Sequence, residues 1–258
     1  MNRYFLSMMK GQEKGLSARL ITCLLLPLSL IYLLGNLFHR YFYALRGRYK
    51  TPKPVISIGN ITVGGSGKTP LVILLSRFLQ EKGIRIKILI RGYMPQALND
   101  SDEVQMLKEQ LPLIQVLAGS DRVSSIKNDL EAPANAYIAD DAFQHWPLGR
   151  DLDIVTIDAG NPFGNGYLLP AGILREPISA LKRANVMVLT KTDHAGDIQA
   201  LTTRLKEINP KALLVESRYK SASPVGVFDN EVLPENFLNE REVVGFCAIG
   251  DPHSFEAA

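Results

Sequence analysis

The chain has 258 residues, 46% hydrophobic and 21% charged, which is close to the globular average and excludes a disordered, collagen-like or low-complexity protein. Lys and Arg number 29 against 26 for Asp and Glu, and a net charge of +3 is too small to indicate a nucleic-acid-binding protein. The two cysteines, Cys23 and Cys247, are far apart in the sequence, which argues against a disulfide framework or a zinc site and fits a reducing compartment.

The first predicted element is an apolar helix over residues 20–38, which carries no formal charge and approaches the roughly 20 residues that a membrane-crossing helix needs. Its apolar residues surround the helix, which argues against a core helix, and no small-residue cleavage site follows, which argues against a signal peptide. Basic residues flank it on both sides: Arg3, Lys10, Lys14 and Arg19 before it, and Arg40, Arg46, Arg48, Lys50 and Lys53 after it. We therefore expect the segment to cross the membrane or to lie in one leaflet with its flanks on anionic head groups.

Beyond residue 53, short apolar runs alternate with amphipathic stretches, which is typical of an α/β fold with a mostly parallel sheet flanked by helices. Strands are predicted at residues 55–59, 86–90, 114–118, 136–139, 153–157, 186–190, 212–215 and 243–249. The clearest helices are residues 69–82, ended by Gly83, and residues 197–208, ended before Pro210.

These elements suggest four parts. Residues 1–50 form the membrane helix and its basic flanks, and residues 51–219 form the α/β core. Residues 220–242 are polar and turn-rich and read as a linker, and residues 243–258 begin a smaller C-terminal α/β unit. We expect that unit to be very small or the chain to be truncated.

A glycine-rich segment follows the first strand and opens the helix at residues 69–82. It comprises Thr62, Val63, Gly64, Gly65, Ser66, Gly67, Lys68 and Thr69. In this context successive backbone N–H groups and a helix N-terminus bind phosphate. Lys68 would reach the β- and γ-phosphates and Thr69 would offer its hydroxyl to Mg²⁺, as in a P-loop, although Thr62 stands where that pattern has its first glycine.

Two adjacent aspartates, Asp140 and Asp141, follow the predicted strand at residues 136–139. A P-loop enzyme needs a carboxylate at a neighbouring strand end to organise Mg²⁺. Successive side chains of a strand point to opposite faces, so one aspartate can bind the metal while the other positions the substrate or accepts a proton. Asp158 has the same placement after the strand at residues 153–157 and is a weaker candidate.

Four segments resemble one enzyme family: ISIGNITVGGSGKTP, LIRGY, IADDAFQH followed by LGRDLDIV, and FGNGYLLPAGILREP, in this order behind the apolar helix. They are similar to tetraacyldisaccharide 4'-kinase, the lipid A 4'-kinase of Gram-negative bacteria, over roughly residues 15–255. The resemblance implies transfer of the γ-phosphoryl of ATP, with Mg²⁺, to the 4'-hydroxyl of a tetraacylated glucosamine disaccharide 1-phosphate. It also implies a P-loop NTPase-like core at the cytoplasmic face of the inner membrane, with the lipid A precursor and the membrane surface as partners. Neither a nucleic acid nor an obligate protein partner is expected.

The resemblance also implies roles for individual residues. Residues 62–69 would bind ATP; Thr69, Asp140 and Asp141 would bind Mg²⁺; Asp102, Asp141 and His145 would be catalytic; Arg122 and Arg175 would bind phosphate or substrate. Guanidinium suits phosphate because its planar fork donates two parallel hydrogen bonds, and Arg91 is a similar candidate. Gln144 completes the DD-x-FQH motif.

Asp102 and Glu103 resemble the family's Asp-Glu pair, but fewer residues separate them from RGY than is usual, and SDEV replaces GDEP. A helix N-cap is the alternative role for Asp102.

Two alternatives to an active kinase stay open. Thr190-Lys191-Thr192-Asp193 resembles the guanine-reading element of GTPases, so the chain could be a membrane-associated P-loop GTPase or ATPase that acts as a switch or maturation factor. A strand-end lysine and a helix-capping Asp193 are the plainer interpretation of that segment. The chain could also be an inactive, truncated member of the kinase family. Residues 248–255 resemble the start of the family's C-terminal domain, and this resemblance makes His253 a weak candidate for a partner of the catalytic aspartate.

Overall fold

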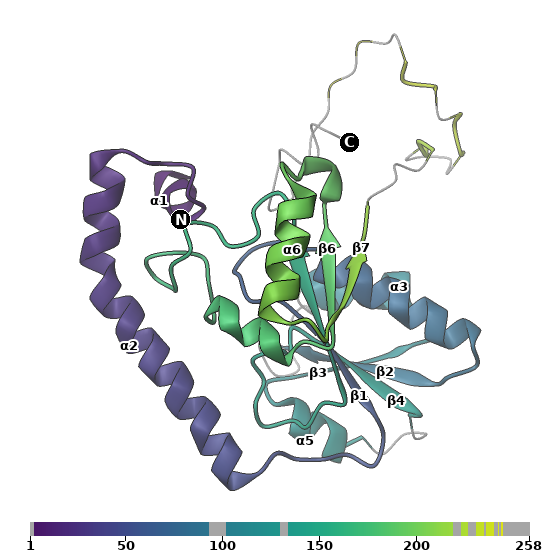
Figure 1. Ribbon diagram of the computed structural model, residues 1–258. Helices are drawn as coiled ribbons and strands as arrows, with labels where there is room; N and C mark the ends of the chain where they lie inside the picture. Colours follow the sequence, from purple (N-terminus) through teal and green to yellow (C-terminus); the bar gives the residue numbers. More distant parts are fainter. Residues whose placement is uncertain are drawn as a thin grey trace. The chain divides into compact units, whose positions relative to one another are not determined.

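The computed structural model describes residues 3–92, 102–129, 134–218, 223–226, 231–234, 236–239, 242 and 244. The chain divides into two compact units, Met1–Ser217 and Arg218–Ala258. All the named helices and strands belong to the first unit (Figure 1). The predicted strand at residues 243–249 lies almost wholly outside the described residues, so the predicted linker and C-terminal α/β unit stay predictions.

One sheet of seven parallel strands forms the centre of the first unit, in the order β3-β2-β4-β1-β5-β6-β7. The strands are β1 (Val55–Gly59), β2 (Ile86–Arg91), β3 (Gln115–Gly119), β4 (Ala136–Asp140), β5 (Leu152–Asp158), β6 (Val186–Thr190) and β7 (Leu213–Glu216). Each of the first seven predicted strands agrees with the structure to within one residue at either end. The central strands are almost continuously apolar because helices cover both faces of a parallel sheet, and the predicted α/β fold is confirmed.

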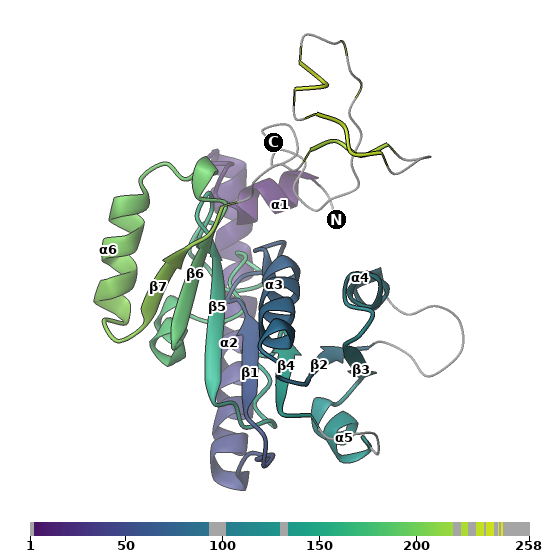
Figure 2. The same ribbon diagram turned by 90° about the vertical axis from the view of Figure 1, so that its right-hand side faces the viewer.

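The helices divide between the two faces of the sheet (Figure 2). They are α3 (Lys68–Glu81), α4 (Asp102–Gln110), α5 (Arg122–Lys127), α6 (Ile198–Ile208) and the 3₁₀ helices η1 (Ile178–Arg183) and η2 (Thr192–His194). On one face, Val72 of α3 and Leu107 of α4 belong to one hydrophobic cluster that also contains Ile58 of β1 and Ile88 of β2. On the other face α5 packs beside β2 and β4, and α6 and η1 pack over β5 and β6.

A long helix, α2 (Leu16–Arg46), follows the short helix α1 (Arg3–Met9) and contains the predicted apolar segment (Figure 1). It runs through Pro27 without interruption. It is long and apolar enough to cross a membrane by length and composition, and only 6% of its most apolar window is buried. The described part of the chain therefore does not use α2 as a core helix.

One narrow stripe of α2 does contact the rest of the first unit. Ala18 and Ser29 are its buried residues; the Ser29 hydroxyl donates to Leu168 O at 2.9 Å, and Asn36 Nδ2 donates to Arg175 O at 3.1 Å. Arg40 lies over Trp146 on the same stripe. At its N-terminal end the stripe is apolar, since Ala18, Ile21 and Leu25 pack in a cluster with Met8, Met9 and Ile173; further along, its contacts are polar. Large apolar side chains such as Leu24, which is 78% exposed, cover the outer surface of the helix.

Candidate active site

The glycine-rich segment connects β1 to α3. Gly64 and Gly67 have φ values of 111° and 76°, which side chains with a Cβ rarely adopt, and α3 begins directly afterwards at Lys68. The first backbone N–H groups of a helix lack partners within the helix and favour anions. The loop therefore has the geometry of a phosphate-binding site.

Thr62, which replaces the first glycine of the P-loop pattern, is held by backbone pairing. It forms an antiparallel bridge with Leu174; next to it Val63 N donates to Ile173 O at 2.8 Å and Arg175 N donates to Ile61 O at 2.7 Å. Thr62 is in an extended pairing that needs no glycine, and this pairing brings Arg175 to the loop.

A buried hydrogen-bond network supports the loop from below. Asn60 Nδ2 donates to the Ser66 hydroxyl at 2.7 Å, and that hydroxyl lies 2.8 Å from the Thr156 hydroxyl on β5. The Thr190 hydroxyl on β6 donates to Ser66 O at 3.1 Å. Asn60 and Thr156 were not predicted as site residues. The one signal in the sequence is that each is a polar residue within or next to an apolar strand.

Asp140 is the last residue of β4 and Asp141 follows it. Because β4 pairs with β1, with Asp140 opposite Ile58, both aspartates lie beside the end of β1 that leads into the glycine loop. Both carboxylate oxygens of Asp141 accept from Arg175 Nη1 at 2.8 Å, and Lys68 Nζ lies 3.7 Å from Asp141 Oδ1. Burial alone would raise the pKa of Asp141, but Lys68 and Arg175 outweigh it and lower that pKa. Asp141 therefore stays ionised at neutral pH.

Asp140 has the opposite environment. It is 4% exposed, and its Oδ1 has no hydrogen-bond partner among the described residues. Burial raises the pKa of Asp140 to about 6, against the opposing effect of Lys68. A buried carboxylate oxygen without a donor is a hard oxygen ligand of the kind that Mg²⁺ prefers, and Thr69, the second residue of α3, would add its hydroxyl. No cluster of three or more His, Cys, Asp or Glu side chains suited to a metal occurs among the described residues, so the substrate phosphates would complete the site.

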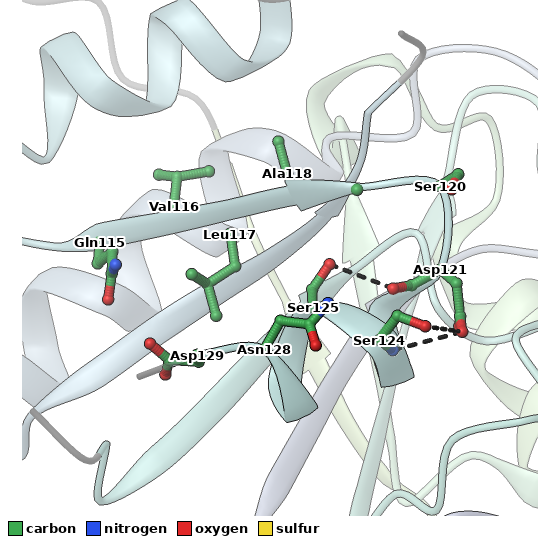
Figure 3. A pocket seen from close by; sticks show the side chains of 11 residues that line it. Gln115, Val116, Leu117, Ala118, Ser120, Asp121, Ser124, Ser125, Asn128 and Asp129 are labelled. Carbon is green, nitrogen blue, oxygen red and sulfur yellow. Dashed lines mark hydrogen bonds between the residues drawn. The ribbon is translucent and has the colours of Figure 1, made fainter. Parts of the chain in front are cut away.

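Arg122 holds the turn that carries both aspartates. Its Nη2 donates to the carbonyl oxygens of Asp140 and Asp141, the latter at 3.3 Å, and its side chain is buried. Asp121 caps α5 by accepting from Val123 N at 3.1 Å and from the Ser124 hydroxyl at 2.8 Å, the second of which Figure 3 shows. This cap fixes Arg122 at the first helical position. Arg122 thus contacts backbone carbonyls in this structure, and its predicted contact with phosphate or substrate stays a prediction.

A cavity of about 650 Å³ lies beside β3 and α5 and is lined in part by Asp121, Ser124 and Asn128 (Figure 3). None of the predicted site residues lines it. It is therefore separate from the glycine loop and the aspartate turn.

Gln144 and His145 complete the turn after β4. Gln144 Nε2 donates to Asn60 O at 2.8 Å and ties the turn to the glycine loop. His145 Nε2 lies 3.9 Å from Asp121 Oδ1 and makes no hydrogen bond among the described residues. Burial, with a further contribution from Arg122, lowers the pKa of His145 to about 4, so its imidazole is neutral at pH 7. Its catalytic role stays a prediction.

Asp102 is the first residue of α4, and the position before it lies outside the described residues. Its neighbour Glu103 is close enough to Asp140 to contribute to the raised pKa of that carboxyl. The predicted catalytic role of Asp102 is not tested by this geometry. Arg91 is exposed at the end of β2, and His253 lies outside the described residues.

The Thr190–Asp193 segment follows β6 and borders the loop. Lys191 Nζ forms a 2.8 Å ion pair with Asp158 Oδ2 at the end of β5, and Asp158 Oδ1 also accepts from Gly160 N at 3.0 Å. Both carboxylate oxygens of Asp158 therefore stabilise the turn after β5. Asp193 lies within η2, and the residue that caps α6 is Asp197, so the suggestion that Asp193 caps a helix is wrong.

Comparison with known proteins identifies the family of the chain. A family model described as tetraacyldisaccharide-1-P 4'-kinase matches residues 21–258. The chain belongs to this family. Two curated relatives named tetraacyldisaccharide 4'-kinase are similar: one from Pelobacter propionicus, 32% identical over 98% of this chain and 73% of the relative, and one from Syntrophus aciditrophicus, 34% identical over 90% and 78%.

A solved structure extends the likeness to the fold. The crystal structure of "apo" form LpxK from Aquifex aeolicus in complex with ATP has a TM-score of 0.69 and 30% identity, covering 92% of this chain and 77% of that chain. The resemblance drawn from the sequence motifs is therefore confirmed at the level of family and fold.

Proposed function

We propose that the chain is an ATP-dependent lipid kinase that phosphorylates the 4'-hydroxyl of a tetraacylated glucosamine disaccharide 1-phosphate, a precursor of lipid A. The chain belongs to the 4'-kinase family, and one observation in its structure supports the proposal most directly. The glycine loop after β1 meets the aspartate turn after β4, where Lys68 Nζ lies 3.7 Å from Asp141 Oδ1. Phosphoryl transfer requires mainly positioning and charge stabilisation. This junction supplies both.

The nucleotide would occupy the glycine loop, where the N-terminus of α3 and its free backbone N–H groups face the phosphates. Lys68 exchanges its contact with Asp141 for the β- and γ-phosphates and stabilises the charge that develops during transfer. Thr69 and Asp140 would hold Mg²⁺, which supplies neutralisation of phosphate charge when bound.

Asp141 would orient the attacking hydroxyl. Its lowered pKa keeps the carboxylate ionised, so it would accept a hydrogen bond from the 4'-hydroxyl. It would take the hydroxyl proton as the oxygen bonds to the γ-phosphorus and the bond from that phosphorus to the β,γ-bridging oxygen breaks, which releases ADP. Arg175, which already donates two hydrogen bonds to Asp141, fixes the direction of that carboxylate and adds positive charge near the transferring group.

The GTPase alternative rests on the Thr190–Asp193 segment. The ion pair between Lys191 and Asp158 gives that lysine a structural partner, so the segment does not favour guanine recognition. An inactive kinase relative shares every feature of the site and differs only in turnover.

Turnover is therefore the test. The full chain, solubilised in detergent, is incubated with radiolabelled ATP and the tetraacyl disaccharide, and a labelled bisphosphorylated lipid is the expected product. Lys68→Ala should lower turnover by about 100-fold or more, because it removes charge stabilisation from the transferring group. Lys82→Ala, at the other end of the same helix, is the matched control and should retain wild-type turnover. Equal turnover of Lys68→Ala and the control would remove the P-loop assignment.

We also propose that α2 holds the enzyme in the cytoplasmic leaflet of the inner membrane without crossing it. The stripe of α2 that contacts the first unit extends from Ala18 to Arg40, which at 1.5 Å per residue is about 33 Å. That is the thickness of the hydrocarbon layer, about 30 Å. If α2 crossed the membrane, the polar domain that contacts it along this stripe would have to lie within the hydrocarbon layer. If α2 lies in the interface, only its apolar outer surface contacts lipid.

A further inference from the structure

Four arginine side chains surround Trp146. The guanidinium carbons of Arg40, Arg48, Arg150 and Arg183 lie 5.4, 5.1, 5.7 and 4.6 Å from its ring centroid. Arg40 belongs to the last turns of α2 and Arg48 follows that helix, whereas the other two come from the core. The indole, 4% exposed, is the shared surface on which these cations rest.

The charges in this cluster do not balance. Arg150 is paired with Asp153 at 2.7 Å and Arg183 with Glu176 at 2.9 Å. Within the described ranges, no carboxylate lies within salt-bridge distance of Arg40 or Arg48, both of which are exposed. Burial, followed by the charge of Arg150, lowers the pKa of Arg48. Asp153 offsets part of this repulsion at Arg48, but the cluster still has four guanidinium groups against two carboxylates, so a further anion would reduce the repulsion between the arginines.

The position of the cluster indicates which anion. Exposed aromatic side chains accompany it at the same end of α2: Phe38 is 71% exposed, Tyr41 63% and Phe42 40%. Aromatic residues gather where the hydrocarbon meets the head groups. The cluster therefore lies at the depth of lipid phosphates when α2 lies in the interface.

We propose that Arg40 and Arg48, resting on Trp146, form a binding site for the phosphate of an anionic membrane lipid. The proposal rests on the interfacial placement of α2 in the proposed function. Two guanidinium forks suit a phosphate diester, and their stacking on one ring reduces the side-chain entropy lost on binding. This is a defined site for one head group, unlike a diffuse attraction between basic flanks and a charged surface.

The test measures flotation of the full chain, without ATP or substrate, with phosphatidylcholine vesicles and with vesicles in which about a quarter of the lipid is phosphatidylglycerol. The double variant Arg40→Gln with Arg48→Gln should bind the anionic vesicles about 30-fold more weakly, because it removes two basic side chains from the lipid surface and affinity falls about tenfold per 1.4 kcal/mol. Its binding to neutral vesicles should change little. Arg85→Gln with Lys206→Gln removes the same charge from surfaces away from α2, and should weaken binding less than about threefold because distant charges are screened.

A second variant tests whether the guanidinium geometry is required in addition to the positive charge. Arg40→Lys with Arg48→Lys keeps both charges but loses the forks, and should recover only part of the binding. Full recovery by lysine, equal losses in the two glutamine doubles, or displacement of the wild type by millimolar glycerol phosphate would each overturn the proposal. Thermal unfolding confirms that each variant is folded. Turnover in detergent is measured separately, and wild-type-like turnover by the glutamine double distinguishes this site from the kinase machinery.

Discussion

Replacing Asp140 by Asn should stabilise the protein at neutral pH while removing its activity. The buried carboxyl has a pKa of about 6 in the folded protein against an ordinary value of 3.8 for an aspartate in water. At 1.36 kcal/mol for each pKa unit, the difference of 2.2 units corresponds to about 3 kcal/mol. Because the folded-state pKa is raised, this cost is absent below pH 4 and fully present above pH 6. The neutral amide of Asn does not carry it.

The assay is thermal unfolding of the detergent-solubilised protein, free of nucleotide, from pH 4 to pH 8. The stability difference between Asp140→Asn and the wild type should grow from nearly zero at pH 4 to about 3 kcal/mol at pH 8, which is about 6–12 °C in Tm for a protein of this size. Turnover should fall because an amide is a poor ligand for Mg²⁺.

Asp129 provides the matched control. Its side chain is only 4% exposed, but it is paired with Lys87 at 2.6 Å. Asp129→Asn should therefore destabilise the protein, by about 3 kcal/mol, because it leaves a buried lysine without its partner. An Asp140→Asn variant that is less stable than the wild type at pH 8, or a stability difference that does not change with pH, would refute the reasoning.

Two further predictions follow from the geometry. Asp141→Asn should lower turnover by about 100-fold or more with little change in ATP binding, because an amide cannot take the hydroxyl proton; ATP affinity and turnover measured together check this, and an unchanged turnover would move the base elsewhere. Replacing three outward residues of α2, Leu24, Ile31 and Phe38, each at least 65% exposed, by Ser should release the enzyme from vesicles at high salt without lowering its Tm. A fall in Tm equal to that of a core substitution would mean that the outer face of α2 packs within the protein.

The strands of the sheet could be predicted because each is specified by the residues of one short segment. Runs such as residues 55–59 and 186–190 combine β-branched residues with flanking turns, and each is buried on both faces, so the apolar pattern and the final structure depend on the same few residues. The glycine loop was equally predictable, since the positive φ values of Gly64 and Gly67 and the helix after them are properties of one short segment.

The contacts that shape the site were not predictable in this way. The pairing of Arg175 with Asp141 joins residues 34 positions apart, and nothing near either residue specifies the other. Arg122 was expected to face phosphate, but the sequence gives no sign that the turn carbonyls after β4 would take its N–H groups. The inner stripe of α2 was missed because Ala18, Ser29 and Asn36 are weak signals among many leucines.

That inner stripe joins the membrane helix to the site through very few residues. Asn36 on α2 donates to the carbonyl of Arg175, the N–H of Arg175 donates to Ile61 beside the glycine loop, and its guanidinium holds Asp141. Arg175 is therefore fixed from three sides: by the helix, by the nucleotide loop and by the aspartate turn. The outer face of α2 is apolar, and its inner face is bonded to the chain segment that carries Arg175. In the interfacial placement proposed above, the position of α2 in the bilayer would therefore also set the depth of the carboxylate that must meet a lipid hydroxyl.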